Sequence, residues 1–257
     1  MYTLERVLEL TKRRVEASKA TGLPDKLPDD GRDPFLFETV LRRPGMSFIC
    51  EVKKASPSAG VICERYGYMT VARQYEDAGA SAISVLTEPD FFMGSSRHLS
   101  EIREIVDVPL LRKDFIIDPF QIKQSAFLGA DAILLICAVL APDQIREYIK
   151  LADSIGLSCL VEVHDEKELE AALSAGSRVI GANNRDLKTL EVDLSVSLRL
   201  KKLAPPDVIF VAESGISTPQ EVRLLTQAGV DGVLIGGALM RAPNKAAMLD
   251  ELRSDKK

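Results

Sequence analysis

Residues 128–136 read LGADAILLI, and three other segments repeat this pattern: AGASAISVL at 78–86, AGSRVIGAN at 175–183 and AGVDGVLIG at 228–236. In each segment a glycine follows an amphipathic stretch and precedes a short apolar run. A glycine just past the last turn is a common way to end a helix, and a short apolar run between turn residues is typical of a buried strand. The four segments therefore predict an internal repeat in which a helix leads into a buried strand.

The same alternation of apolar runs and amphipathic stretches begins earlier and covers most of the chain. The runs begin near Phe48, Ser81, Pro109, Asp131, Leu157, Arg178, Val208 and Val230. Each interval accommodates one strand, one loop and one helix, and near-continuous apolar strands favour a parallel sheet covered by helices. Eight units are the number that closes a (β/α)₈ TIM barrel, which we predict for residues 48–257. The alternative is an open doubly wound sheet, which usually carries a glycine-rich turn after its first strand. Here FICEVKKASPSAG at 48–60 ends that strand with charged residues instead.

Residues 1–47 differ from this repeat. Leu4, Val7, Leu8 and Val15 lie on one face of a predicted helix, and TGLPDKLPDDGRDP at 21–34 is rich in turn residues. A second short helix is predicted from Phe35 to Leu41. We expect this α-helical extension to pack on the barrel, so that residues 1–257 form one domain.

Composition excludes several classes of protein. Hydrophobic residues make up 46% of the chain, charged residues 28%, and the net charge is −5. Without a basic block, a nucleic-acid or anionic-membrane partner is not expected, and the ten-residue apolar run at 132–141 is too short to span a bilayer. The N-terminus shows no signal-peptide pattern. Four scattered cysteines and two histidines favour neither disulfides nor a metal site, so we expect a cytoplasmic protein without a metal or other cofactor.

Charged side chains stand at the ends of several predicted strands, where the active sites of such barrels lie. Because side chains alternate along a strand, Glu51 and Lys53 share a face with Ile49, while Cys50 and Val52 face the helices. The same parity places Lys113 with Leu111 and Glu162 with Leu160 inside the barrel. Further polar residues end the sixth and seventh strands: Asn183, Arg185 and Glu213. These side chains are predicted to meet in one small volume.

Two turns near the end of the chain predict a phosphate site. Glu213-Ser214-Gly215 and Leu234-Ile235-Gly236-Gly237 lead from strands into helices, and small residues there leave backbone N–H groups open to an anion. The loop containing Ser56 after the first strand adds hydroxyl donors or serves as a lid. Phe92 and Phe115 fit a pocket wall and a buried loop anchor equally well, and His164 either faces the site or, as we favour, begins the next helix.

These residues predict an enzyme that handles a small phosphorylated molecule with lysines and carboxylates. Two chemistries fit. A lysine of lowered pKa can form a Schiff base, or a lysine and a glutamate can act as general acid and base. Spacing does not choose between them.

Several motifs resemble the indole-3-glycerol phosphate synthase family. The most specific is Glu51-Val52-Lys53-Lys54-Ala55-Ser56-Pro57-Ser58-Ala59-Gly60. Others follow in family order over nearly the whole chain: Leu86-Thr87-Glu88, Phe92-Met93-Gly94-Ser95, Pro109 to Phe115, Leu160 to Val163, Gly181 to Leu187, and Val211 to Ile216. The resemblance implies ring closure, decarboxylation and dehydration of 1-(2-carboxyphenylamino)-1-deoxyribulose 5-phosphate. The product would be indole-3-glycerol phosphate, in tryptophan biosynthesis.

The resemblance also implies a role for each site residue. Lys113 is the general acid at the carbonyl and Glu162 the proton carrier in dehydration. Lys53 binds anionic groups and serves as acid in one step, although which lysine acts in each step stays open. The remaining implied residues hold the lysines or the substrate (Glu51, Asn183, Glu213, Arg185), surround the phosphate (Ser56, Ser214, Gly215, Gly236, Gly237) and enclose the aromatic ring (Phe92, Phe115, Leu134, Leu187).

One motif departs from the family pattern. Relatives often carry hydroxyl residues after the first glycine of the last turn, whereas this chain reads Gly236-Gly237-Ala238. Phosphate binding there would rely on backbone N–H groups and would be weaker. Two other classes are a Schiff-base aldolase on the same barrel, using Lys53 or Lys113, and a phosphate-binding module without activity. We expect a monomer or a weakly associating homodimer.

Overall fold

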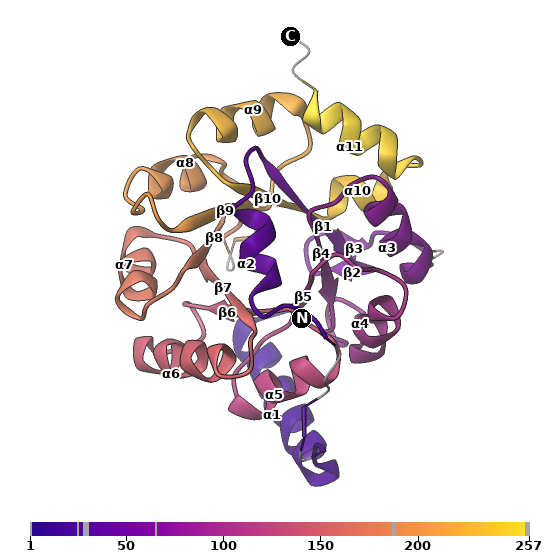
Figure 1. Ribbon diagram of the computed structural model, residues 1–257, viewed down its shortest axis with the longest axis vertical. Helices are drawn as coiled ribbons and strands as arrows, with labels where there is room; N and C mark the ends of the chain where they lie inside the picture. Colours follow the sequence, from indigo (N-terminus) through magenta and orange to yellow (C-terminus); the bar gives the residue numbers. More distant parts are fainter. Residues whose placement is uncertain (1, 25, 28–30, 65, 187–188, 255–257) are drawn as a thin grey trace.

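The computed structural model describes residues 2–24, 26–27, 31–64, 66–186 and 189–254. Its centre is a closed barrel of eight parallel strands, with β1 paired to both β10 and β4 (Figure 1). In chain order the strands are β1 (Ser47–Val52), β4 (Ala82–Leu86), β5 (Leu110–Lys113), β6 (Ala132–Ile136), β7 (Ser158–Val163), β8 (Val179–Asn183), β9 (Ile209–Glu213) and β10 (Gly232–Ile235). The predicted TIM barrel is therefore confirmed, and the open sheet is excluded.

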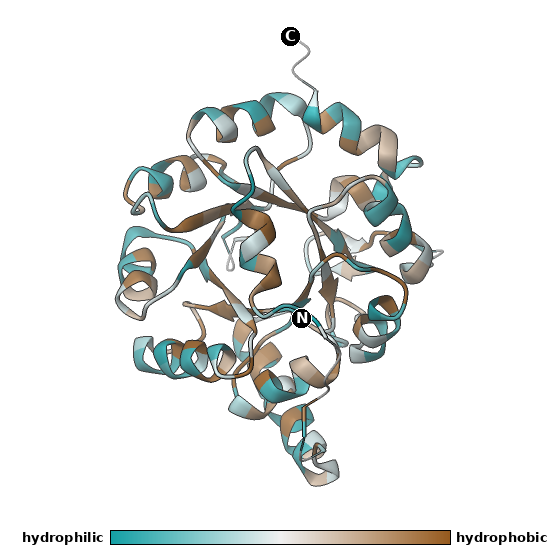
Figure 2. Cartoon of the chain, viewed as in Figure 1, coloured by the Kyte–Doolittle hydropathy of each residue, from teal (hydrophilic) through white to brown (hydrophobic). Residues whose placement is uncertain are grey.

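Helices surround the barrel and turn their apolar sides toward it (Figure 2). They are α3 (Tyr68–Asp77), α4 (Ser96–Arg103), α5 (Pro119–Phe127), α6 (Pro142–Asp153), α7 (Glu166–Ser174), α8 (Ser195–Lys201), α9 (Pro219–Gln227), α10 (Gly237–Arg241) and α11 (Lys245–Arg253). Side chains such as Asp118, Asp165 and Thr218 accept hydrogen bonds from the first turns. The glycine that ends the helix in each of the four repeats has a positive φ, from 76° at Gly79 to 92° at Gly176, which a residue with a side chain adopts only at a cost.

Side chains of the strands divide between two apolar clusters, as parity predicts. Cys50 and Val52 pack under the helices, whereas Ile49, Leu111 and Leu160 fill the barrel interior. Arg112 is an exception on the helix side, where it is only 4% exposed. Its guanidinium is paired with Asp114 at 3.2 Å and donates to Thr87, Gln124 and Ser125, so the desolvation of its charge is offset.

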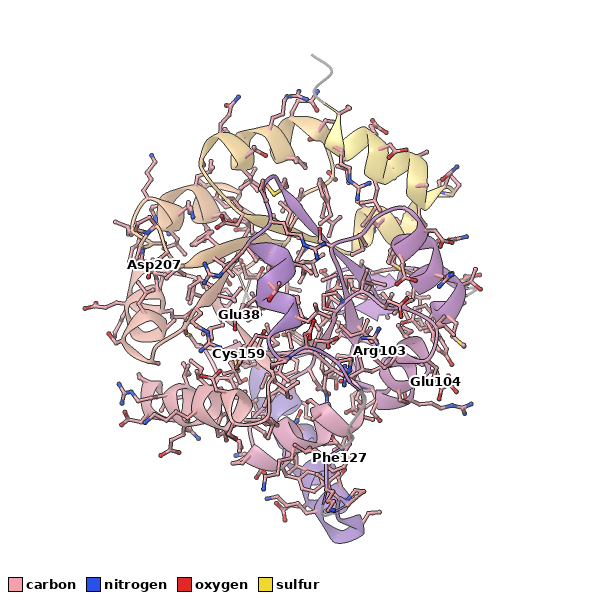
Figure 3. The ribbon with its side chains drawn as sticks, in the orientation of Figure 1. Glu38, Arg103, Glu104, Phe127, Cys159 and Asp207 are labelled. Carbon is pink, nitrogen blue, oxygen red and sulfur yellow. The ribbon has the colours of Figure 1, made fainter. Side chains whose placement is uncertain are left out.

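Helix α2 (Leu36–Leu41) lies across the end of the barrel where the strands begin (Figure 1). Phe37, Val40 and Leu41 are buried in the interior cluster. Glu38, labelled in Figure 3, accepts two hydrogen bonds from Arg178, the residue just before β8. The short helix begins one residue later than predicted, because Phe35 adopts a left-handed conformation with φ of 57° and serves as its N-cap.

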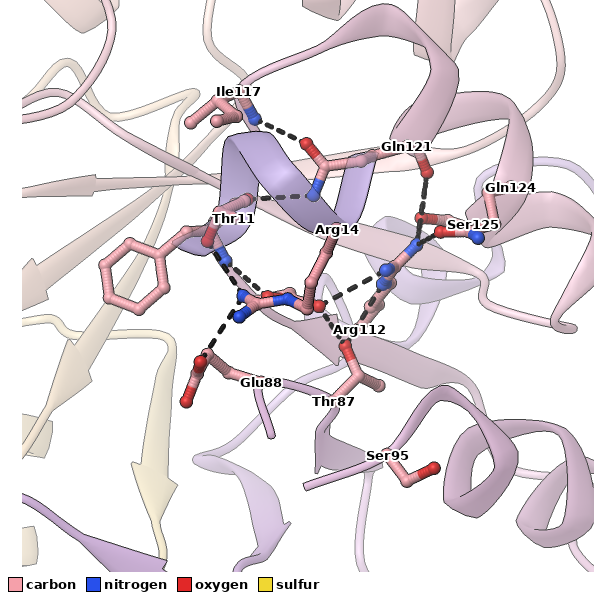
Figure 4. Close-up of polar contacts among 12 residues, drawn as sticks. Thr11, Arg14, Thr87, Glu88, Ser95, Arg112, Ile117, Gln121, Gln124 and Ser125 are labelled. Carbon is pink, nitrogen blue, oxygen red and sulfur yellow. Dashed lines mark hydrogen bonds and ion pairs between the residues drawn. The ribbon is translucent and has the colours of Figure 1, made fainter. Parts of the chain in front are cut away.

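Helix α1 (Leu4–Thr21) lies at the opposite end of the barrel, over the loops that follow β4 and β5. Val7 enters the interior cluster and is fully buried. Arg14 contacts Thr11 at 2.8 Å and Glu88 at 3.3 Å, as Figure 4 shows beside the Arg112 network. The extension therefore covers both ends of the barrel.

The structure adds elements that the sequence analysis did not predict. The loop after β1 contains a short antiparallel hairpin, β2 (Ala55–Ser56) with β3 (Gly60–Val61). One helix was predicted after the last strand, and two, α10 and α11, follow it. Within the described ranges no helix is long and apolar enough to cross a membrane.

Candidate active site

A cavity of about 340 Å³ opens at the C-terminal ends of the strands. It gathers every site residue predicted from the sequence that the structure describes. These are Glu51, Lys53, Ser56, Phe92, Lys113, Phe115, Leu134, Glu162, Asn183, Arg185, Glu213, Ser214, Gly215, Gly236 and Gly237. Leu187, also predicted, lies outside the described residues.

Lys113 occupies the centre of the buried charges in this cavity. From the end of β5, its Nζ lies 2.9 Å from Glu162 Oε2 on β7 and 3.0 Å from Glu213 Oε2 on β9. Burial disfavours the ammonium, but the charges of Glu162 and Glu213 outweigh it and raise the Lys113 pKa above its ordinary value. Lys113 is therefore an ammonium with its protons directed at carboxylates.

The two glutamates beside Lys113 have different proton affinities. Burial raises the pKa of Glu213 to about 7, even though Lys113 opposes the shift. Burial acts on Glu162 as well, yet the charges of Lys113 and His164 and a hydrogen bond from Asn183 hold its pKa below the usual range. Adjacent carboxylates with separated pKa values are typical of acid–base catalysis.

Glu51 and Lys53 form a second ion pair at the end of β1, on the same face of the strand. Gly236 borders it: a Cβ there would lie 2.2 Å from Glu51 Oε1 and 2.9 Å from Lys53 Nζ. Gly181 on β8 likewise borders a carboxylate, because a Cβ added there would lie 2.2 Å from Glu213 Oε1. Both glycines therefore provide the space that buried carboxylates occupy.

Two turns form one side of the cavity. Ser214 and Gly215 both have positive φ, 67° and 77°, and such a conformation is unusual for serine. The other turn begins α10, whose N-cap is Gly236. The first N–H groups of a helix have no partner within it, and Gly236 has no side chain to accept from them. Arg241, one turn further along α10, places NH1 3.2 Å from where a Gly237 Cβ would lie.

Apolar side chains form another part of the cavity wall. Phe92, Phe115 and Leu134 line the cavity together with Tyr2. The turn that carries Phe92 is fixed by Glu88, which accepts hydrogen bonds from the backbone N–H groups of Asp90, Phe91 and Phe92. Of the two interpretations of Phe92 and Phe115, the pocket wall is the one that the structure shows.

His164 does not begin a helix, contrary to the interpretation that we favoured. Asp165 is the N-cap of α7, and His164 is the link between it and β7. Its Nε2 lies 3.5 Å from Glu162 Oε1, and its Nδ1 lies 3.0 Å from Glu168 Oε2. Strand parity places Glu162 inside the barrel, and it places His164, two residues later, on the same face. This parity was the sequence signal that could have placed His164 correctly.

Among the cavity residues that sequence reasoning missed are Tyr2, Leu190 and Arg241. Arg241 follows Gly237 by four residues, so helical spacing would have placed the two together. Tyr2 reaches the cavity because α1, which follows it, lies across the active-site end of the barrel. The ring of Tyr2 contacts that of Phe91 edge-on, with 5.4 Å between the ring centroids. Leu190 stands in a loop with a φ of 63°, and no sequence signal marks it.

Across the described part of the chain, no three His, Cys, Asp or Glu side chains are grouped to hold a metal ion. The fold and the site define a TIM-barrel protein with a buried lysine–glutamate cluster at the C-terminal ends of its strands, the arrangement of an acid–base enzyme. The family model for indole-3-glycerol phosphate synthase matches residues 4–252. The chain belongs to this family.

Curated relatives agree with the family match. The chain is 51% identical to the indole-3-glycerol phosphate synthase of Ruminiclostridium cellulolyticum, over 96% of this chain and 94% of the relative. It is 49% identical to that of Endomicrobium trichonymphae, over 97% and 99%. Among solved structures, 3-hexulose-6-phosphate synthase from Salmonella typhimurium has a TM-score of 0.67 at 16% identity, covering 81% of this chain and 97% of that chain. That likeness concerns the fold alone.

Proposed function

We propose that this protein is a carboxy-lyase of tryptophan biosynthesis that converts 1-(2-carboxyphenylamino)-1-deoxyribulose 5-phosphate into indole-3-glycerol phosphate. Membership of the family gives the reaction. The observation that supports this reaction for this chain is the contact of Lys113 with Glu162 and Glu213 inside one cavity.

Lys113 stabilises the first step. The ring carbon that bears the carboxylate attacks the ribulose carbonyl, and negative charge develops on the carbonyl oxygen. A protonated lysine held nearby stabilises that charge most in the transition state and then supplies the proton. Carbon dioxide leaves with its bonding electrons taken up by the ring iminium, so this step needs no metal.

Glu162 is the proton carrier of the last step, in which the new ring loses its hydroxyl and a proton from the neighbouring carbon as water. Its pKa is held low, so it is ionised and accepts the carbon-bound proton, while a lysine ammonium of the site protonates the departing hydroxyl. Asn183 hydrogen-bonds Glu162, and Glu213 fixes the second side of Lys113. Glu51 holds Lys53, which faces the anionic groups of the substrate, and Arg185 belongs to the same polar network.

The phosphate binds at the turns around Ser214-Gly215 and Gly236-Gly237, with Ser56 opposite. Gly237 and Ala238 supply no hydroxyl groups, and the guanidinium of Arg241 beside Gly237 supplies a charged donor in their place. The aromatic ring lies against Phe92, Phe115 and Leu134, with Leu187 the remaining residue assigned to this wall.

A Schiff-base aldolase is disfavoured by the charge on Lys113. Forming a Schiff base requires an unprotonated amine, whereas three carboxylates, Glu162, Glu213 and Glu51, raise the pKa of Lys113. The cluster is suited to donating a proton rather than attacking a carbonyl.

The setting of the enzyme follows from the same features. We propose a cytoplasmic protein, supported by the free thiols of Cys50, Cys137 and Cys159. We also propose that it is a monomer or a weakly associating homodimer. Residues 1–47 belong to the same domain as the barrel, because Val7 and Phe37 are buried in the barrel interior.

The experiment is a fluorescence assay for the indole product. The chain contains no tryptophan, so indole emission has little background. Wild type should convert the substrate, Lys113→Ala should lose about 10²–10⁴-fold in kcat, and Arg241→Ala should mainly raise KM. Substrate that binds without any indole signal would overturn the proposed reaction, and normal turnover by Lys113→Ala would overturn the role of that lysine.

A further inference from the structure

His164 lies between two carboxylates, those of Glu162 and Glu168. Nδ1 lies 3.0 Å from Glu168 Oε2, and the backbone N–H of His164 donates to the same oxygen at 2.8 Å. On its other side, Nε2 lies 3.5 Å from Glu162 Oε1. Glu168 belongs to α7 and is not part of the cavity lining, so it fixes the imidazole from outside the site.

The second oxygen of Glu162 faces this imidazole. Oε2 of Glu162 is paired with Lys113, and Oε1 is the oxygen nearer to His164. The Nε2 atom is buried and makes no hydrogen bond within the described residues. A buried polar atom without a partner is unfavourable, and here it is aimed at the oxygen of a reacting group.

The contact between His164 Nε2 and Glu162 Oε1 is most favourable when one of these two atoms, and not both, carries a proton. When Nδ1 carries a hydrogen toward Glu168, a neutral His164 presents a lone pair at Nε2. That lone pair repels an ionised Glu162, whereas an imidazolium attracts it and a protonated Glu162 can donate to it. The imidazole can therefore accompany Glu162 through both of its protonation states.

We propose that His164, held by Glu168, is a positioning residue that orients Glu162 and keeps it ionised between proton transfers. The inference rests on the proposed function, since it takes Glu162 to be the proton carrier. It adds to the site a carboxylate–imidazole–carboxylate chain, Glu162–His164–Glu168, that reaches from the cavity to α7.

The charges around His164 support this role. Burial lowers its pKa, but the hydrogen bond that it donates to Glu168 and the charges of Glu162, Glu168 and Glu213 outweigh burial and raise the pKa above the ordinary value for histidine. Lys113 is the nearby cation, paired with Glu162. Asp165 is the other acid on the α7 side, and Cys137, whose pKa is raised to about 12 chiefly by burial, stays neutral. The raised pKa extends to higher pH the range in which an imidazolium faces Glu162.

The first test needs no activity. The chain has two histidines, His98 and His164, and the pKa of His98 is lowered, chiefly by burial. NMR titration of the imidazole signals, assigned with His98→Gln, should place His164 above 6.5 and His98 below it. Glu162→Gln and Glu168→Gln should each lower the pKa of His164. A His164 pKa unmoved by Glu162→Gln would overturn the proposal.

The second test is the pH profile of His164→Asn, a neutral side chain that still forms hydrogen bonds. Its kcat should fall about 10- to 100-fold at pH 6 with a smaller change in KM. The deficit should shrink as pH rises through the His164 pKa, because wild type then loses its imidazolium too. The acidic limb of the variant should move to higher pH, since Glu162 loses a stabilising cation.

The outcomes separate the two proposals. A wild-type protein without synthase activity would remove the proposed function, while the NMR titration would still test the pairing of His164 with Glu162. An active wild type with a deficit in His164→Asn that is constant at every pH would mean that the histidine only fills space, and the proposal would be wrong.

Discussion

Gly181 shows how a single absent side chain shapes the active site. It lies in the middle of β8 without a positive φ, so backbone conformation does not require glycine there. What requires it is Glu213 Oε1, which would lie 2.2 Å from a Cβ. The absence of a side chain at Gly181 leaves the space that the Glu213 carboxylate occupies beside Lys113.

We expect Gly181→Ala to reduce kcat about 10- to 100-fold, since Glu213 must move and Lys113 loses one of its two partners. Gly232→Ala is the matched control, because that strand glycine also has no positive φ and its Cβ would meet ordinary contacts of 3.4 Å or more. Steady-state fluorescence assays on both variants, with circular dichroism to confirm folding, make the comparison. Equal activity of the two variants would contradict the proposed role of Gly181.

The placement of individual residues was predictable where strand parity governs it. Glu51, Lys113 and Glu162 reach the cavity because side chains alternate along a strand and the outer face must meet helices. Arg241 and Tyr2 were missed because they come from a helix and from the extension, whose positions depend on packing rather than on strand register. His164 was misassigned because the residue after a strand can belong to either element, and the side chain of Glu168 decides here.

At the scale of elements, α1 and α2 cover opposite ends of one barrel and serve different purposes. Helix α1 contributes to the active-site end, where Tyr2 lines the cavity. Helix α2 covers the other end, where Phe37 is fully buried among interior side chains. The first is therefore tied to function and the second to stability.

Phe37→Ala should lower the free energy of unfolding by about 3–5 kcal/mol, the usual effect of removing a buried phenylalanine. Because α2 lies far from the C-terminal ends of the strands, kcat and KM at 25 °C should stay within about threefold of wild type. Urea unfolding and steady-state kinetics measure the two effects. Leu203→Ala, at a side chain that is 56% exposed, should change neither, and loss of activity in a folded Phe37→Ala would refute the division of roles.

The sequence predicted the repeated elements well, since glycine-ended helices and apolar strands are local features. The hairpin of β2 and β3 was not predicted, because its strands of two residues show no hydrophobic alternation. That two helices rather than one follow β10 was missed for a different reason: α10 spans only Gly237–Arg241 and carries no periodic pattern. Short elements are fixed by what they pack against.

At the scale of the whole molecule, the active site places an excess of negative charge inside the fold. Glu51, Glu162 and Glu213 are all buried and face two ammonium groups, those of Lys53 and Lys113. Burial, together with the neighbouring charges of Glu162 and Glu51, raises the pKa of Glu213. Such a cluster serves catalysis at the expense of stability.

The consequence is a stability that falls as pH rises. Glu213 has a pKa of about 7 in the folded protein against about 4.5 when unfolded. Between these values the folded state binds more protons than the unfolded state, so the free energy of unfolding decreases with rising pH across that window and the penalty is complete above pH 7.

Glu213→Gln removes this ionisation while keeping a side chain of the same shape. Its free energy of unfolding should match that of wild type near pH 5 and exceed it at pH 8 by on the order of 2 kcal/mol, while kcat falls because Lys113 loses its second partner. Urea unfolding at both pH values tests this. Glu38→Gln is the contrasting control: it weakens the pairing with Arg178 and should destabilise the protein at pH 8. A Glu213→Gln protein less stable than wild type at pH 8 would show that the Lys113 contact outweighs the burial of the charge.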